Sequence, residues 1–282
     1  MAVARTGVTP GTRYQPITGR PAFVWAFLDA MVLARRSVLR TLRAPELIVF
    51  VAIQPVMFVL LFRYVFGGAI QVPGGQYVNY LMPGIFVQTV AFGGVITGIG
   101  LAEDMQRGLI DRFRSLPMSS SAVVSGRTVA DLARNGFTVA IMLIVGFLVG
   151  FRPQGTIFEF MLGILVLMGI SFAFSWISAF IGLAVRSVEA AQSGGFIWMF
   201  PLTFASSAFV PVTTMPSWLQ PFAKHNPVTV LSDALRGLFH VNPALTTADT
   251  RWALIQSVAW IAAILVVFIP LSVIKYRSST AR

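Results

Sequence analysis

Long apolar stretches dominate the hydrophobic pattern of this chain. Six of them are long enough for a helix that crosses a bilayer, which needs roughly 20 mostly apolar residues. They cover residues 46–66, 78–102, 128–151, 157–185, 190–212 and 252–274. The pattern therefore predicts an all-α membrane protein with six transmembrane helices, joined in one transmembrane domain over residues 22–274.

Residues 215–236, between the fifth and sixth stretches, are apolar but interrupted, and we call them the broken segment. Pro216, Pro221 and Pro227 each remove a backbone donor and crowd the preceding turn, which stops a continuous helix. Asn226 is a favourable N-cap, and proline suits the first helical position after it. Apolar residues follow at helical spacing: Val228, Leu231, Leu235 and Leu238. We expect two short helices that dip into the membrane and return, a re-entrant helical hairpin.

The two ends of the chain differ from the apolar domain. Residues 1–21 are rich in glycine and proline with little periodicity, which predicts a disordered cytoplasmic tail. Residues 22–43 place apolar and arginine side chains on opposite faces of a helix, which predicts an N-terminal amphipathic helix along the membrane interface. This helix is equally compatible with a plain anchor and with contact to a cytoplasmic partner. Residues 275–282 are expected to form a cytoplasmic C-terminal tail.

The loop after the second stretch carries a second amphipathic pattern. Met105, Leu109, Phe113 and Leu116 form an apolar ridge at helical spacing, and Pro117 ends it. We call residues 107–117 the coupling segment. A short helix of this kind suits docking into a groove of a partner protein, which we favour over a solvated helix that rests on the membrane.

Composition and charge set the orientation. The chain of 282 residues is 56% hydrophobic and 11% charged, whereas soluble domains carry about 25% charged residues. With six crossings, most of the 21 lysines and arginines fall on the side that holds both termini, and the positive-inside rule makes that side cytoplasmic. The net charge of +11 is thus explained by topology and lipid headgroups, and we expect no nucleic-acid partner.

The sequence offers little chemistry of its own. It lacks a phosphate-binding loop of the G-x-x-x-x-G-K-[ST] type, so we expect no ATP site in this chain. Its acidic residues lie at the edges of the apolar stretches or in loops, which argues against ion coupling. The two histidines, His225 and His240, have no suitable serine, and no adjacent acid pair completes a metal site. The absence of cysteine excludes disulfides and thiolate sites.

Three smaller patterns bear on packing. Phe196, Phe200 and Phe204 form a stripe on one face of the fifth stretch, which fits helix packing or lipid contact, or else an aromatic wall for an amphipathic substrate. Gly94-x-x-x-Gly98 is typical of closely approaching membrane helices. Arg152 and Glu159 fall at one predicted boundary, where we expect a structural ion pair.

Together these residues resemble the ABC-2 type permeases, the six-span membrane subunits of ATP-driven exporters, and in particular the daunorubicin-resistance branch of drug and lipid exporters. Residues 108–117 of the coupling segment are similar to the cytoplasmic coupling helix of that family. The run M-P-x-W-L-Q-P at 215–221, then N-P at 226–227 and A-L-R at 234–236, is similar to its extracytoplasmic re-entrant hairpin. The likeness covers nearly the whole chain beyond the N-terminal tail.

The resemblance implies a permease subunit in the bacterial plasma (inner) membrane that moves amphipathic drugs or lipids outward. Its expected partners are separate ABC-type ATPase subunits, which hold ATP and Mg, a second permease copy or paralogue, and membrane lipids. The expected ATPase-coupling residues are Arg107, Gly108, Leu109, Asp111, Arg112, Phe113, Arg114, Leu116 and Pro117. The expected substrate path holds Gln88, Thr89, Phe92, Gln192, Phe196, Phe200 and Phe204. The expected exit cap holds Met215, Pro216, Trp218, Gln220, Pro221, Asn226, Pro227 and Arg236.

Two other functions remain open at this stage. An ABC-2 permease for polysaccharide or glycolipid is one, although sugar stacking favours tyrosine and tryptophan, and the chain has 24 Phe against 5 Tyr and 6 Trp. A multi-span scaffold that transports nothing is the other. We expect no enzymatic activity, no catalytic residue and no metal in this chain.

Overall fold

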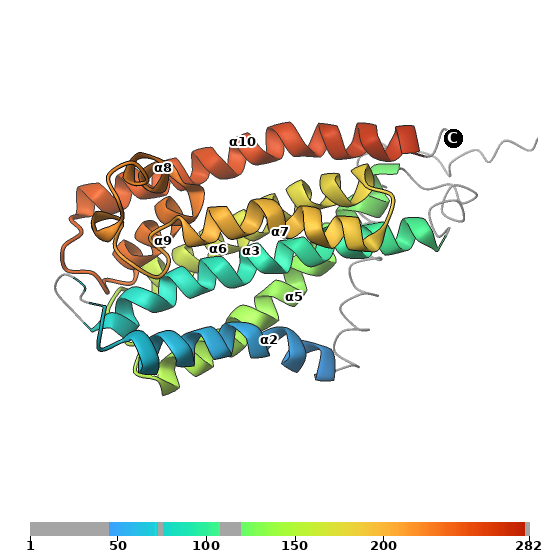
Figure 1. Ribbon diagram of the computed structural model, residues 1–282. Helices are drawn as coiled ribbons and strands as arrows, with labels where there is room; N and C mark the ends of the chain where they lie inside the picture. Colours follow the sequence, from blue (N-terminus) through green and yellow to red (C-terminus); the bar gives the residue numbers. More distant parts are fainter. Residues whose placement is uncertain (1–44, 71, 73–75, 108–119, 280–282) are drawn as a thin grey trace, which may run out of the picture.

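The computed structural model describes residues 45–70, 72, 76–107 and 120–279, and within these ranges the regular elements are all helical. The predicted N-terminal tail, the interface helix over 22–43 and the coupling segment after Arg107 lie outside them. The long helices run side by side along one common direction, with α8 and α9 gathered at one end (Figure 1).

The elements follow the apolar stretches of the sequence. In chain order they are α2 (Pro45–Leu60), the π-helix η1 (Leu61–Phe66), α3 (Tyr77–Gln106), α5 (Ser120–Leu148), α6 (Ile157–Ala184), α7 (Val188–Phe204), the 3-10 helix η2 (Val212–Thr214), α8 (Gln220–His225), α9 (Pro227–Leu238) and α10 (Thr247–Ser279). The last helix continues past residue 275, into the predicted C-terminal tail.

Four helices of the described ranges are long and apolar enough to cross a membrane. They are Tyr77–Gln106, Gly126–Leu148, Ile157–Ala184 and Thr247–Tyr276. They correspond to the second, third, fourth and sixth predicted spans. The first corresponds to a shorter apolar helix, Ala52–Phe66, which comprises the end of α2 and η1. The fifth corresponds to α7, which has 17 residues.

The helix α7 ends at Phe204, well before the apolar stretch ends at residue 212. The carbonyl oxygens of Leu202, in its last turn, and of Ala205, its C-cap, accept hydrogen bonds from the side-chain amide of Asn226 at 2.6 and 2.9 Å. A helix end leaves carbonyls without intrahelical donors, and these must be satisfied when they are buried. The N-cap residue of α9 therefore stabilises the early end of α7. The hydrophobic pattern of the fifth stretch could not predict this contact.

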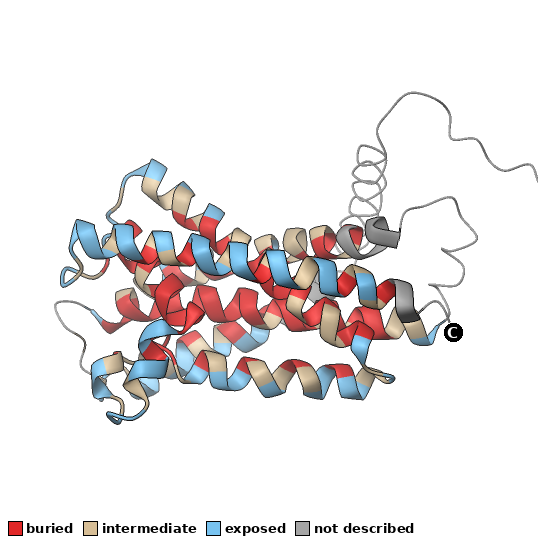
Figure 2. Ribbon diagram, turned by 90° about the horizontal axis from the view of Figure 1, so that it is seen from above, coloured by how far each residue is buried: buried red, intermediate tan, exposed pale blue. Residues whose placement is uncertain are grey.

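The centre of the bundle is α3, which packs against α5, α6, α7 and α9 and is buried along almost its whole length (Figure 2). Its closest neighbour is α6. A Cβ atom built on Gly98 would lie 2.3 Å from the carbonyl oxygen of Ser178, and one built on Gly182 would lie 2.2 Å from the carbonyl oxygen of Gly98. The two backbones thus touch where glycine leaves room, as the Gly94-x-x-x-Gly98 pattern predicted.

Candidate functional site

The broken segment forms two short helices, as the prolines predicted. Asn226 separates α8 from α9 and caps α9, because its Oδ1 accepts a hydrogen bond from the backbone N–H of Val228 at 2.9 Å. Pro227 occupies the first position of α9. The apolar face of α9 joins the main core through Val228, Leu231, Leu235 and Leu238. The N-cap and the core face predicted from the sequence are confirmed.

Arg236 is the largest fully buried side chain of the described residues. Its Nε donates to the carbonyl oxygen of Tyr80 at 3.0 Å, and its Nη2 donates to that of Ser207 at 2.6 Å. Its Nη1 donates to Asp233 Oδ1 at 2.6 Å and to Ser207 Oγ at 2.9 Å. The guanidinium also lies 3.6 Å from the centre of the Tyr80 ring. A buried guanidinium is stable only when its donors are paired. Here the paired donors of Arg236 join α9 to α3 and to the chain after α7.

Asp233 and Arg236 lie one turn apart on α9 and form a local ion pair, to which the structure adds long-range partners. Tyr77 and Tyr80 of α3 also donate their hydroxyls to the carbonyl oxygens of Phe209 and Ser207, at 2.9 and 3.1 Å. The irregular chain after α7 is thereby held against the start of α3.

The remaining residues of the expected exit cap lie nearer the surface. Trp218 is 77% exposed, and Pro216 and Pro221 are exposed as well. Gln220 donates its side-chain amide to the carbonyl oxygen of Met215 at 2.9 Å. These residues are therefore more exposed than Arg236 and Asn226, which are buried.

Glu159 pairs differently from our expectation. Its Oε1 lies 3.1 Å from His240 Nε2, and its Oε2 accepts from the backbone and hydroxyl of Thr156 in a capping box. Arg152 instead donates to the carbonyl oxygens of Phe147 and Phe151. The predicted Arg152–Glu159 ion pair is wrong. Arg152 is engaged by carbonyl oxygens at and just after the end of α5, and Glu159 by Thr156 and by His240, which follows α9.

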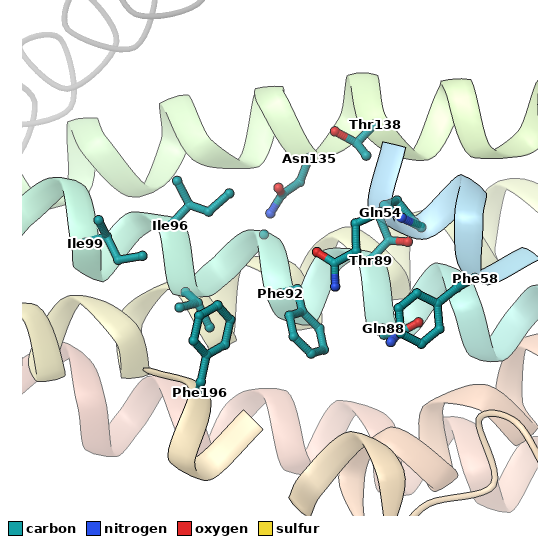
Figure 3. Close-up of a pocket in the computed structure, with 13 residues that line it drawn as sticks. Gln54, Phe58, Gln88, Thr89, Phe92, Ile96, Ile99, Asn135, Thr138 and Phe196 are labelled. Atoms are coloured by element: carbon teal, nitrogen blue, oxygen red, sulfur yellow. The ribbon is translucent and has the colours of Figure 1, made fainter. Parts of the chain in front are cut away.

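A cavity of about 140 Å³ lies between α2, α3, α5 and α7, and we call it the aromatic cavity (Figure 3). Four of the expected substrate-path residues line it: Gln88, Thr89, Phe92 and Phe196. The other lining residues are Gln54, Pro55, Phe58, Gly93, Val95, Ile96, Ile99, Asn135 and Thr138. Its walls are thus mainly aromatic and aliphatic, with amide and hydroxyl groups between them.

The other members of the expected path divide into two groups. Phe200 and Phe204 continue from Phe196 along α7, with ring centres 5.5 and 5.8 Å apart. Phe204 then meets the ring of Phe209 at 5.4 Å. Gln192 is exposed near the start of α7 and is not part of the cavity wall. The structure thus brings the phenylalanines together with Gln88 but leaves Gln192 apart.

The opposite end of the bundle carries an ion-pair network, which comprises Asp104 of α3 and Arg127, Asp131 and Arg134 of α5. Arg127 Nη1 lies 2.7 Å from Asp104 Oδ2, and Arg134 Nη1 lies 2.9 Å from Asp131 Oδ1. Arg134 also donates to the carbonyl oxygen of Gly93, in the cavity wall. The network therefore extends from the end of α3 to the aromatic cavity.

Of the coupling segment, the structure describes Arg107 alone. It caps the C-terminus of α3 and forms a long ion pair with Glu103 at 3.8 Å. The expected docking residues Gly108, Leu109, Asp111, Arg112, Phe113, Arg114, Leu116 and Pro117 lie outside the described residues. The segment leaves α3 three residues after Asp104, beside the ion-pair network.

Comparison with known proteins agrees with this arrangement. The sequence model of the ABC-2 type transporter family matches residues 29–240. The chain belongs to the ABC-2 type transporter family. It is 32% identical to a daunorubicin resistance ABC transporter permease protein of Streptomyces coeruleorubidus, over 93% of this chain and 90% of that protein. It is 24% identical to a doxorubicin resistance ABC transporter permease protein of Mycobacterium tuberculosis, over 89% and 86% of the two chains, and 30% identical to a probable doxorubicin resistance permease of the same organism, over 80% of each.

The match to the ABC-2 family includes the aromatic cavity, the ion-pair network and the broken segment. The sequence analysis missed Gln54, Phe58, Asn135 and Thr138 of the cavity wall. They belong to α2 and α5, and the hydrophobic pattern does not reveal that these helices pack beside α3. The sequence analysis also missed the ion-pair network. The spacing of Arg127, Asp131 and Arg134 at i, i+4 and i+7 was a signal for it, since such positions face one another on a helix.

Proposed function

We propose that this chain is the membrane permease subunit of an ATP-binding cassette exporter, driven by separate ATPase subunits on the cytoplasmic side. The observation that carries the proposal is the match to the ABC-2 family over most of the chain, together with relatives named as drug-resistance permeases. Four helices able to cross a membrane and a broken segment at one end of the bundle agree with this role.

The proposed topology has six crossings with both termini in the cytoplasm. In it α2 with η1 and α7 are the two shorter spans, beside the four long helices. Each lies along the same direction as the long helices in Figure 1, and exposed apolar residues such as Met57, Tyr64 and Ile197 suit contact with lipid. The broken segment then lies on the extracytoplasmic side as a re-entrant cap over the exit.

Coupling to the ATPase is assigned to residues 107–117. Leu109, Phe113 and Leu116 supply an apolar ridge, and the charged residues around them set its register in the groove of the partner. The ion pair between Asp104 and Arg127 joins α3 to α5 beside this segment, so a shift of the segment would move both helices.

The proposed cargo is an amphipathic drug or lipid, which moves along α2, α3 and α7 where two permease copies or paralogues meet. The names of the relatives refer to daunorubicin and doxorubicin resistance. Seven phenylalanines line or adjoin the aromatic cavity in this chain: Phe58, Phe62, Phe92, Phe196, Phe200, Phe204 and Phe209. Such a surface suits an aromatic or lipid-like substrate better than a sugar chain.

The variant Phe113→Asp tests the coupling role. We expect it to remove most substrate-dependent ATPase stimulation and export, because a carboxylate replaces the apolar centre of the docking ridge. The measurement is ATPase activity and export by the reconstituted complex. Phe113→Leu keeps the ridge apolar and should retain both activities. Export at the wild-type rate by Phe113→Asp would refute docking through this helix, and recovery of the chain with no bound ATPase subunit would refute the permease role.

A further inference from the structure

The aromatic cavity contains a buried amide group with unused hydrogen-bonding capacity. The side chain of Gln88 is 3% exposed, and neither its Nε2 nor its Oε1 has a hydrogen-bond partner among the residues that the structure describes. A buried amide without partners destabilises the protein, because water no longer solvates it. A ligand that supplied both partners would remove this penalty on binding.

The other buried polar side chains of the wall are already engaged, whereas Gln54 of α2 is exposed. Thr89 donates its hydroxyl to the carbonyl oxygen of Ile85 at 2.7 Å, and Thr138 donates to that of Arg134 at 3.2 Å. Asn135 donates its amide to Ser171 Oγ at 2.8 Å. Gln88 is therefore the buried wall residue whose donor and acceptor both stay available to a ligand.

The size and walls of the cavity limit the kind of ligand. A volume of about 140 Å³ is close to that of an engineered protein cavity of about 150 Å³ that binds benzene, so one aromatic ring fits. The rings of Phe58, Phe92 and Phe196 stand around this space in Figure 3. None of the lining residues carries a titratable side chain, so a charged group would stay unpaired there.

A larger ligand has a route out of the cavity. Phe200 lies 5.5 Å from both Phe92 and Phe196, ring centre to ring centre, and Phe204 follows it. Phe200 and Phe204 are 45% and 44% exposed, so their rings are open to contact on the outer side. One ring of a polycyclic or amphipathic molecule would occupy the cavity while the rest lies along these phenylalanines.

We propose that the aromatic cavity is a binding subsite for one ring of an uncharged aromatic compound that bears a hydrogen-bond donor beside an acceptor, as an aromatic carboxamide does. Gln88 is the residue that selects this pair of groups, through its Oε1 and Nε2. The proposal rests on the permease function proposed above, in which this cavity belongs to the substrate path. It names the part of the substrate that the chain recognises.

A binding measurement on the complete complex tests the subsite. The permease, purified with its ATPase subunits in lipid nanodiscs, is titrated with 2-naphthamide by naphthalene fluorescence, and empty nanodiscs serve as the blank. We expect saturable binding that Gln88→Leu weakens roughly tenfold, the effect of leaving the amide of the ligand unpaired. Naphthalene-2-carboxylate should bind the wild-type protein at least tenfold more weakly than 2-naphthamide.

Two controls separate recognition from damage to the fold. Gln154→Leu makes the same change at an exposed position between α5 and α6, outside the cavity wall, and should leave 2-naphthamide binding unchanged. Gln88→Leu should still bind 2-methylnaphthalene, which has the same fused rings without an amide, and so report that the cavity is intact.

Three results would overturn the subsite. They are absence of saturable 2-naphthamide binding, equal affinity of Gln88→Leu and wild type for it, and equal affinity of the wild type for 2-methylnaphthalene and 2-naphthamide. The last would mean that water, not a ligand, satisfies Gln88. None depends on ATP-driven export, so the subsite can fail while Phe113→Asp still uncouples the transporter. Conversely, the permease role can fail while 2-naphthamide binding persists.

Discussion

At the scale of single residues, Arg236 shows how a charge can be buried in an apolar bundle. Its guanidinium reaches three carbonyl oxygens, a hydroxyl and a carboxylate while one face lies on the Tyr80 ring. Only the planar fork of arginine can donate in these directions at once, since lysine carries a single point charge. The residue therefore fixes α9 to α3 and to the chain that follows α7.

Arg236→Met should destabilise the protein by roughly 3–5 kcal/mol, the usual cost of removing one partner of a buried pair. Asp233 and the carbonyl oxygens of Tyr80 and Ser207 would lose their donor. Arg236→Lys should recover part of this loss. The measurement is the thermal unfolding midpoint of the purified protein in nanodiscs. Arg251→Lys, at an exposed position of α10, is the matched control and should not change the midpoint. A midpoint of Arg236→Lys equal to wild type would show that the fork geometry is dispensable.

The sequence predicts the local capping and pairing contacts of α9 but not its contacts with distant residues. Asn226 and Pro227 could be assigned as N-cap and first helical position because both roles depend on adjacent backbone. The pairing of Asp233 with Arg236 is also local. The bond from Arg236 to Tyr80 joins residues 156 positions apart, and no pattern within α9 reveals it.

At the scale of elements, the contact of α3 with α6 depends on two glycines that allow the backbones to touch. Gly98→Ala should destabilise the bundle by about 1–3 kcal/mol, since its Cβ would overlap the carbonyl group of Ser178 and the helices would have to separate. Gly68→Ala is the control, because a Cβ there meets nothing within 4 Å. Thermal unfolding of both variants in nanodiscs checks the prediction, and equal midpoints would mean that α6 can move away at no cost.

The same two helices show what element patterns can and cannot predict. Gly94-x-x-x-Gly98 predicts a close approach, but the pattern does not say that α6 supplies the other side. The end of α7 is a similar case. Its apolar stretch continues to residue 212, yet the helix stops at Phe204. There the side-chain amide of Asn226, in the broken segment, donates hydrogen bonds to the last carbonyl oxygens. Helix ends of this kind are decided by distant side chains.

At the scale of the whole molecule, the aromatic cavity lies between two clusters of paired polar side chains, one at each end of the bundle. The Arg236 cluster holds the end that carries the broken segment, and the ion-pair network of Asp104, Arg127, Asp131 and Arg134 holds the other end. Gly93, whose carbonyl oxygen accepts from Arg134, belongs to the cavity wall. Under the proposed coupling role, a movement of the coupling segment would reach the aromatic cavity through these contacts of α3 and α5.

Single-cysteine labelling decides whether α7 is a full crossing in this arrangement. The chain contains no native cysteine, so Ala190→Cys introduces one thiol at an exposed position in the first turn of α7, and Ser217→Cys introduces one at an exposed position beyond its end. With six crossings, a membrane-impermeant maleimide should label Ser217→Cys in intact cells and Ala190→Cys only after permeabilisation, because the positive-inside rule places the chain around Arg186 in the cytoplasm. Labelling of both variants in intact cells, or of neither, would put the two ends of α7 on one side. The 17-residue helix would then be a re-entrant element, the broken segment would lose its place over the exit, and the path from the aromatic cavity along Phe200 and Phe204 would not lead across the membrane.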